Sequence, residues 1–253
     1  MKSRIVLSLA MAAALPLVAD TTTANVVGLI RVDSSEKETI VSIPFVATSA
    51  NATDAAIPVT DIVKTANLAV GDKLEYYNSA QGKYEVWQIV AGEGGVKTWQ
   101  AATSVNEGEM TVASSSLARG NAIILVRTTP GACFYLQGQV AKSGSAECTM
   151  AQGSASAPAY SLIAPPSDAA VALNSGVWSN VGADDQVRIG GKIFWFDASS
   201  GKWGTYATDP TTFAKTFTPA DVTIAVGTGA WFISAPGAAK AAQVTWLNLP
   251  SVQ

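Results

Sequence analysis

The stretch Gly71-Asp72-Lys73-Leu74-Glu75-Tyr76-Tyr77-Asn78 is followed closely by Gly82-Lys83-Tyr84-Glu85-Val86-Trp87, and this order of residue types occurs twice in the chain. The second copy contains Asp184-Asp185, Phe194-Trp195-Phe196-Asp197 and Gly201-Lys202-Trp203-Gly204-Thr205-Tyr206. Each copy then reaches an apolar run, Ile123-Ile124-Leu125-Val126 in the first and Ala230-Trp231-Phe232-Ile233 in the second. Landmarks that recur in the same order predict two copies of one β-rich module.

Each aromatic stretch has the pattern of a β-hairpin. Asn78 enters a short loop that ends in Gly82, and Asp197 enters one that ends in Gly201. An Asn or Asp side chain bonds the turn backbone and glycine accepts a positive φ, so we expect four-residue turns at 79–82 and 198–201. One short helix is expected between residues 54 and 68, and no amphipathic pattern is longer than about two turns. The predicted fold class is mainly β: two related β-sandwich-like or β-barrel-like repeats with short helices.

The repeats define the expected domain organisation. Residues 20–142 form the first β repeat and residues 159–253 the second. The segment 143–158 is rich in Ala, Gly and Ser and is expected to be a linker. The segment 187–192 has no partner in our alignment of the two copies and is interpreted as an insertion in the second.

The first nineteen residues have the layout of a cleaved export signal. Lys2 and Arg4 precede an apolar stretch that ends at Ala19, and such a stretch is too short to span a bilayer, which takes about 20 residues. Cleavage is expected after Ala19, with Ala24 as the second choice. The mature protein is therefore predicted to be exported to the periplasm, cell surface or medium, without a transmembrane span.

Composition and charge restrict the partners. The chain is 48% hydrophobic and 14% charged, and its formal net charge is −3. Its sixteen basic residues are scattered, whereas phosphate backbones are bound by clustered Lys and Arg. Nucleic acid is therefore not an expected partner.

The two cysteines, Cys133 and Cys148, flank a glycine-containing stretch. In an oxidising, exported setting we expect them to form one disulfide. The alternative is a pair of free or metal-binding thiols.

Several short steps follow one another in a fixed order: Ile43-Pro44 or Ala164-Pro165, a short helix, Gly71-Asp72, an aromatic strand and a Gly-Lys-aromatic step. This order resembles that of an uncharacterised family of exported β-repeat proteins of planctomycete- and verrucomicrobia-type bacteria. Members of that family begin their mature chains with Val-Val-Gly-like strands, as residues 26–28 do here. The second copy departs from the pattern at Asp184-Asp185. The resemblance implies export and a β architecture, and it brings no activity.

The chain contains no histidine, which removes Ser-His-Asp and Cys-His catalysis and imidazole-bound zinc. Glycoside hydrolysis remains open, because it requires only two carboxylates; the candidates are Asp72, Glu75, Glu85, Asp184, Asp185 and Asp197. The simpler interpretation is that Asp72 and Asp197 serve turns and that Glu75 and Glu85 face solvent on a hairpin. We therefore expect no catalytic residue, no metal site and no cofactor.

Aromatic side chains are the best candidates for ligand binding. The set comprises Tyr77, Tyr84, Trp87, Trp99, Trp195, Trp203, Tyr206 and Trp231. Exposed rings stack on the apolar faces of sugars, whereas the competing interpretation places these rings in the β cores, which aromatic residues often dominate. The predicted ligand contacts are Tyr84, Trp87, Trp195, Trp203 and Tyr206.

Three functions follow as hypotheses. The first is an exported, non-catalytic structural or interaction protein of the cell surface or envelope, which self-associates or binds envelope components. The second is a carbohydrate-binding module that uses exposed aromatic residues. The third is a carboxylate-based, glycan-active enzyme.

Overall fold

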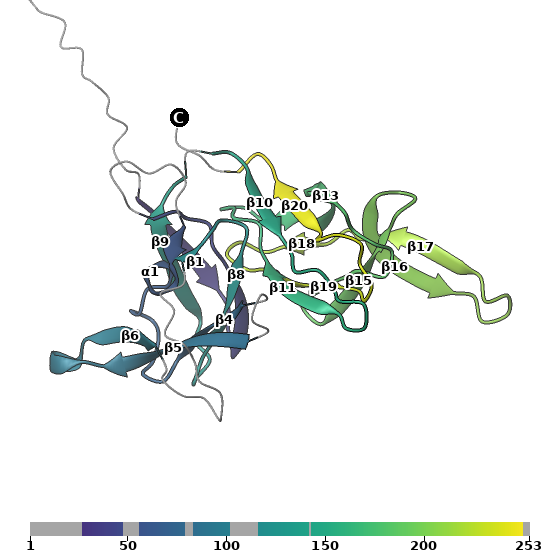
Figure 1. Cartoon of the computed structure of the whole chain (residues 1–253). Coiled ribbons are helices and arrows are strands. Elements are labelled where there is room, and N and C mark those ends of the chain that lie inside the picture. The colour runs from purple at the N-terminus through teal and green to yellow at the C-terminus, as the bar shows by residue number, and fades with distance from the viewer. Residues whose placement is uncertain (1–26, 48–55, 79–82, 102–115, 142, 250–253) are drawn as a thin grey trace, which may run out of the picture.

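The computed structural model describes residues 27–47, 56–78, 83–101, 116–141 and 143–249. Antiparallel strands joined by turns make up most of its regular structure (Figure 1). The predicted mainly β, sandwich-like fold is therefore confirmed. The predicted signal peptide at 1–19 and the predicted turn at 79–82 lie outside the described residues.

The first unit contains a five-stranded antiparallel sheet in the order β2-β8-β4-β5-β6. The strand pairs β1–β9 and β3–β7 accompany this sheet. The elements are β1 (Val27–Asp33), β2 (Glu38–Ser42), β3 (Ile57–Pro58), α1 (Val59–Ile62), β4 (Lys73–Asn78), β5 (Lys83–Ala91), the 3-10 turn η1 (Glu93–Gly95), β6 (Lys97–Ala101), β7 (Ser116–Leu117), β8 (Ala122–Val126) and β9 (Cys133–Gln139). Helix α1 lies inside the segment 54–68, where the sequence predicts a short helix.

The second unit contains a six-stranded antiparallel sheet in the order β11-β19-β14-β15-β16-β17. A three-stranded sheet β10-β20-β13 and the pair β12–β18 complete it. The elements are β10 (Ala146–Thr149), β11 (Ala159–Ile163), β12 (Val171–Ala172), the 3-10 turn η2 (Leu173–Ser175), β13 (Val177–Ser179), β14 (Gln186–Ile189), β15 (Lys192–Asp197), β16 (Lys202–Thr208), β17 (Lys215–Pro219), β18 (Thr223–Ile224), β19 (Ala230–Ser234) and β20 (Gln243–Trp246).

The two units share one strand topology. The order β2-β8-β4-β5-β6 of the first sheet recurs as β11-β19-β14-β15-β16 in the second, which adds β17 at its far edge. The pairs β1–β9 and β3–β7 recur as β10–β20 and β12–β18. The duplication inferred from residue types is thus also a duplication of strand order.

A buried aspartate occupies the same place in both units. Asp72 precedes β4 and Asp185 precedes β14, and their exposed fractions are 0% and 2%. One oxygen of each carboxylate accepts a hydrogen bond from the backbone amide three residues earlier, at 2.8 Å. The other oxygen accepts one from the amide of Thr128 or of Ala235, at 2.7 Å, just beyond β8 or β19. Each aspartate therefore ties a turn to the neighbouring strand, and the prediction that Asp72 serves a turn is confirmed.

The structure corrects the alignment of the two copies. The segment 187–192, interpreted above as an insertion, contains most of β14 and its turn, and β14 is the counterpart of β4. The aromatic hairpin at 194–206 is β15–β16, whose counterpart is β5–β6 rather than β4–β5. The sequence comparison was therefore shifted by one hairpin, because successive hairpins of this fold carry similar aromatic and Gly-Lys steps.

The segment 143–158, predicted to be a linker, contains strand β10. Its residues pair in antiparallel register with β20, so that Cys148 lies opposite Val244. This part of the segment therefore belongs to the second unit, where it takes the place that β1 has in the first.

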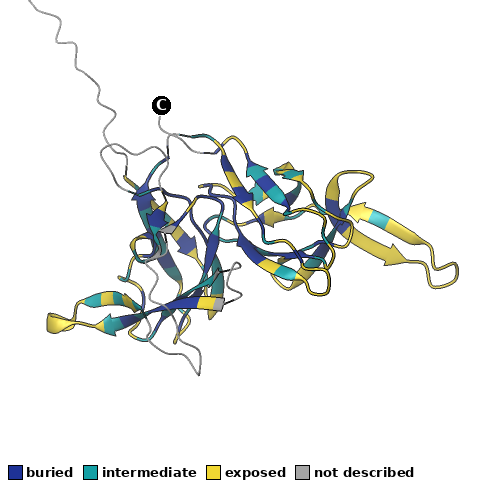
Figure 2. Ribbon diagram, in the orientation of Figure 1, coloured by how far each residue is buried: buried dark blue, intermediate teal, exposed yellow. Residues whose placement is uncertain are grey.

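Each unit has its own hydrophobic core. The first is formed mainly by aliphatic residues with Phe45, Trp87 and Phe134, and the second contains Trp203, Phe232 and Trp246. Figure 2 shows buried segments at the centre of both units, whereas the β16–β17 hairpin, which projects from the second, is mostly exposed. Burial of this apolar surface is the main stabilising contribution to each unit.

The two units meet through reciprocal contacts. The amide of Ser42 in the first unit donates to the carbonyl of Gly227 in the second at 2.9 Å, and the amide of Ala164 in the second donates to the carbonyl of Gly120 in the first at 3.0 Å. Ser42 is the last residue of β2, and Ala164 directly follows β11, the equivalent strand of the second unit. Gly120 and Gly227 lie in the turns before the equivalent strands β8 and β19. Such an exchange of equivalent contacts is the pattern of a two-fold dimer, here made within one chain.

A small cluster of apolar residues fills the junction between the units. Its buried members are Ala122 from the first unit and Leu162 and Ala164 from the second. Tyr77 and Trp231 pack against it from the two sides. At the junction, the two large sheets therefore contact each other through their outer faces, which point away from each unit's own core.

Candidate functional site

Two of the predicted ligand contacts lie in the cores. Trp87 is 5% exposed and Trp203 is completely buried. The ring of Trp203 lies 5.0 Å from that of Trp178 and 5.3 Å from that of Phe196, measured between centroids. Their burial leaves neither indole a face for a ligand, so the competing interpretation as core residues applies to both.

Two others lie on the projecting hairpin and its neighbouring strand. Trp195 is half-buried on β15, and Tyr206 on β16 is exposed. The ring of Tyr206 packs against Phe217 at 5.2 Å, and its hydroxyl donates to Asp197 at 3.3 Å. Neither Trp195 nor Tyr206 lines the pocket described next.

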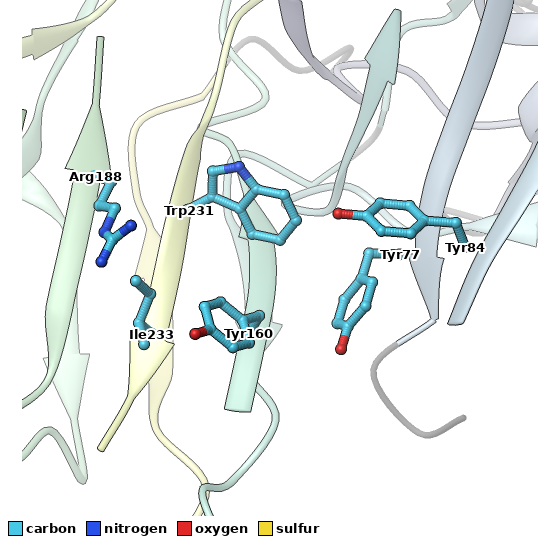
Figure 3. A pocket seen from close by; sticks show the side chains of 6 residues that line it. All are labelled: Tyr77, Tyr84, Tyr160, Arg188, Trp231 and Ile233. Carbon is cyan, nitrogen blue, oxygen red and sulfur yellow. The ribbon is translucent and has the colours of Figure 1, made fainter. Parts of the chain in front are cut away.

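A pocket of about 290 Å³ lies at the junction of the two units (Figure 3). The first unit contributes Tyr77 from β4 and Tyr84 from β5, and the second contributes strands β11, β14 and β19. Its lining consists of Tyr77, Tyr84, Tyr160, Arg188, Trp231 and Ile233. Tyr84, which the sequence analysis selected, is 42% exposed here.

The aromatic rings of the pocket form a continuous chain of contacts. The centroids of Tyr77 and Tyr84 are 5.0 Å apart, those of Tyr77 and Trp231 are 6.0 Å apart, and those of Tyr160 and Trp231 are 6.3 Å apart. The contacts of Trp231 are edge-to-face, a favourable arrangement of aromatic pairs. The rings are therefore held by one another as well as by their strands.

Strand alternation explains why the second unit presents these side chains. Phe232 points into the core with an exposed fraction of 0%, so its neighbours Trp231 and Ile233 point to the opposite, outer face of the sheet. Arg188 lies directly opposite Trp231, and Tyr160 directly opposite Ile233, so both share that outer face.

The residues that line the pocket have different counterparts in the other unit. The paired positions of Tyr77 and Tyr84 correspond in register to Gly190 and Gly191, which form the short turn between β14 and β15. The first unit's hairpin is thus longer, and its two tyrosines reach over the second unit. The residues equivalent to Tyr160, Arg188 and Trp231 are Glu38, Glu75 and Ile124.

The charges around the pocket differ between its two sides. Burial raises the pKa of the Tyr84 phenol above its ordinary value, and the nearby carboxylates of Glu75 and Glu38 raise it further. Burial also raises the pKa of the Glu75 carboxyl, which Lys73 opposes and Glu38 reinforces. The phenol of Tyr84 therefore stays protonated at neutral pH and can donate a hydrogen bond to a ligand. Arg188 supplies the positive charge on the other side.

Three of the six candidate catalytic carboxylates accept hydrogen bonds from backbone amides. Asp72 and Asp185 hold the turns described above, and Asp197 accepts hydrogen bonds from the backbone and hydroxyl of Ser200 at 2.9 and 2.6 Å. The prediction that Asp197 serves a turn is therefore confirmed. Glu85, expected on the solvent face, is 8% exposed, because it shares the inward face of β5 with Trp87.

The predicted disulfide is not formed, and both cysteines are free thiols. Cys133 begins β9 opposite Asp33 in the first unit, and its sulfur accepts a hydrogen bond from Asn67 at 3.3 Å. Cys148 lies on β10 within the core of the second unit. The prediction treated both residues as ends of one loop, whereas the fold places them in different units.

Three lining residues were absent from the aromatic set of the sequence analysis: Tyr160, Arg188 and Ile233. The alternation of the runs 159–163 and 230–234 could have assigned Tyr160 and Ile233 to one sheet face. No local signal marks Arg188, because its role depends on which strands lie beside β14.

No family model, no curated protein and no solved structure matches this chain. The resemblance to an exported repeat family therefore stays a prediction. No helix among the described residues is long and apolar enough to cross a membrane.

Proposed function

We propose that this chain is an exported, non-catalytic interaction protein that binds a saccharide in the junction pocket. The observation that carries the proposal is the set of four aromatic rings from two units that line one open pocket. Such a set suits sugar rings, whose C–H faces are apolar and whose rims carry hydroxyls. Convergent aromatic and polar groups in a concave, largely apolar site are the usual mark of a small-molecule site.

The pocket offers two kinds of contact to a sugar. The indole of Trp231 and the rings of Tyr77 and Tyr160 provide apolar surfaces for stacking. The hydroxyls of the three tyrosines both donate and accept hydrogen bonds, which matches the hydroxyls of a sugar. A volume of about 290 Å³ is at the lower end of small-molecule sites, which suits a short saccharide portion rather than a bulky ligand.

The non-catalytic part of the proposal is supported by the chemistry of the side chains. The chain has no histidine, and the described residues that line the pocket include no carboxylate. A glycosidase mechanism requires two carboxylates on either side of the scissile bond. The pocket as lined is suited to holding a sugar rather than to cleaving one.

The test is a glycan array followed by affinity measurements with Trp231→Ala. We expect the substitution to weaken binding at least about tenfold, because a central aromatic contact commonly contributes more than 1.4 kcal/mol. Tyr206→Ala is the control, since Tyr206 is an exposed aromatic residue of the same unit that lies outside the pocket. Equal affinity of the Trp231→Ala and unaltered proteins for every bound glycan would remove this site from the function.

A second candidate is self-association, as in a structural protein of the envelope. Strand β17 is the edge of the second sheet, and four of its five residues are exposed. Phe213, in the turn before β17, is 78% exposed. Unpaired edges with exposed apolar residues are sites of chain-to-chain pairing. Sedimentation velocity over a concentration series tests pairing with a second copy. We expect the unaltered protein to associate as the concentration rises and Phe213→Ser to associate less. If the unaltered protein stays monomeric throughout the series, self-association through this edge is contradicted.

A further inference from the structure

The position of Arg188 adds a charge to the aromatic pocket. Arg188 lies on β14, between β19 and β15, opposite Trp231 on one side and Ile193 on the other. It is exposed, and Figure 3 shows its guanidinium beside Ile233 and Trp231, on the side of the pocket. Because β14 is an inner strand of the sheet, the backbone that carries this arginine is fixed on both sides.

The charge of Arg188 is not neutralised by a neighbouring side chain of the described chain. No ion pair joins Arg188 to a carboxylate of the described residues. The other lining residues of the pocket are three tyrosines, a tryptophan and an isoleucine, so among the residues that the structure describes the lining has one cation and no anion. The exposed guanidinium is hydrated, so it can bind an incoming anion directly, and this attraction weakens as the salt concentration rises.

The equivalent position in the first unit carries the opposite charge. Glu75 on β4 corresponds to Arg188 on β14, and Glu38 corresponds to Tyr160. The two sides of the pocket therefore differ in charge: Arg188 lies on the side of the second unit, whereas Glu75 and Glu38 act on Tyr84 on the side of the first. An acidic group of a ligand is expected to bind on the Arg188 side.

We propose that the ligand of this pocket is an acidic saccharide, whose uronic-acid carboxylate pairs with Arg188 while its ring stacks on Trp231. The inference rests on the proposed function and assigns the class of glycan. The planar guanidinium fork matches a carboxylate with two parallel hydrogen bonds. The distance from an arginine to a stacked ring on the next strand is short, because adjacent strands lie about 4.8 Å apart.

The experiment measures affinity for oligomers of galacturonate, mannuronate and guluronate, each beside its methyl ester. The ester keeps the sugar and its linkage and removes only the charge. We expect the acid of at least one pair to bind at least tenfold more tightly than its ester. Arg188→Met is expected to lower the affinity for the acid to that for the ester, and Arg188→Lys to leave it in between.

Lys202→Met is the control for the loss of a positive charge, because Lys202 is exposed on β16 of the same sheet and does not line the pocket. It is expected to leave the preference unchanged. Equal binding of acid and ester, or a preference that survives in Arg188→Met, overturns the acidic ligand and leaves saccharide binding intact. Absence of binding to every acidic and neutral glycan overturns the proposed function itself.

Discussion

The contact between the units can be tested at Gly227. This residue has φ +70°, and its own carbonyl accepts the hydrogen bond from the amide of Ser42. A β-carbon built there would lie 2.3 Å from Cγ2 of Val32, which is 1% exposed in the core of the first unit. Gly227→Ala therefore inserts a methyl group into the junction where no room exists.

Gly201 provides a control with the same backbone conformation. Its φ is +67°, and a β-carbon built there meets nothing within 4 Å. Gly201→Ala therefore measures the cost of left-handed backbone alone, about 1–2 kcal/mol. At Gly227 the same cost applies, and overpacking adds about 1–3 kcal/mol, because carbon atoms pack at about 3.5–4.0 Å. The expected difference between the two variants is about 1–3 kcal/mol.

The assay is guanidinium unfolding followed by tryptophan fluorescence, with thermal unfolding beside it. Each kcal/mol corresponds to about 2–4 °C in Tm for a chain near this length. Gly120→Ala is expected to lie between the other two in overpacking, since its β-carbon would be 3.3 Å from Cβ of Cys148 at the reciprocal contact. If Gly227→Ala and Gly201→Ala lower the stability equally, the junction is not packed as described and the units are not held by this turn.

Three further outcomes are expected. Trp203→Ala should lower the free energy of unfolding by about 3–5 kcal/mol, as large-to-small core changes do. Tyr206→Ala should change it by less than about 1 kcal/mol in the same denaturation experiment. An equally small change in the free energy of unfolding for Trp203→Ala would contradict the burial of Trp203. Alkylation of the native protein at pH 8 should modify Cys133 and spare Cys148, because burial raises the pKa of the Cys148 thiol to about 12. Mass spectrometry should find both thiols reduced. Labelling of Cys148 in the native protein would contradict its place in the core. In a carboxyl NMR titration Asp197 should show a pKa of about 2, since hydroxyl and amide donors of its turn stabilise the carboxylate. The contribution of Asp197 to stability is then complete above the ordinary pKa near 4 and is lost as pH falls towards 2. A titration midpoint near 4 would contradict the hydrogen bonds of this turn.

Local patterns were sufficient for the aromatic hairpin and for the existence of a repeat, but not for the alignment of its two copies. The hairpin at 194–206 follows from alternating aromatic residues and from Asp197 and Gly201 at its turn, and the structure has β15 and β16 there. The role of Asp72 in a turn was also predictable, because an aspartate after glycine and before a strand bonds its own backbone. These features depend on interactions between residues that are close in sequence.

The choice among the aromatic residues was not predictable from such patterns. Trp203 and Tyr84 have the same kind of neighbours in sequence, yet one is completely buried and the other is 42% exposed. Which face of a strand is covered depends on what packs against the sheet, and the strand alternation alone says only that the two faces differ. For the same reason the sequence predicted a disulfide between Cys133 and Cys148, which the fold places in separate units.

The sequence by itself determined the mainly β architecture and the doubling of one strand pattern, because an alternation of period two and the turn residues act over a few positions. The tertiary structure alone decided the reciprocal junction and the pocket beside it. That pocket joins Tyr77 to Trp231, which are 154 positions apart in the chain, and only the packing of one complete unit against the other brings such positions together.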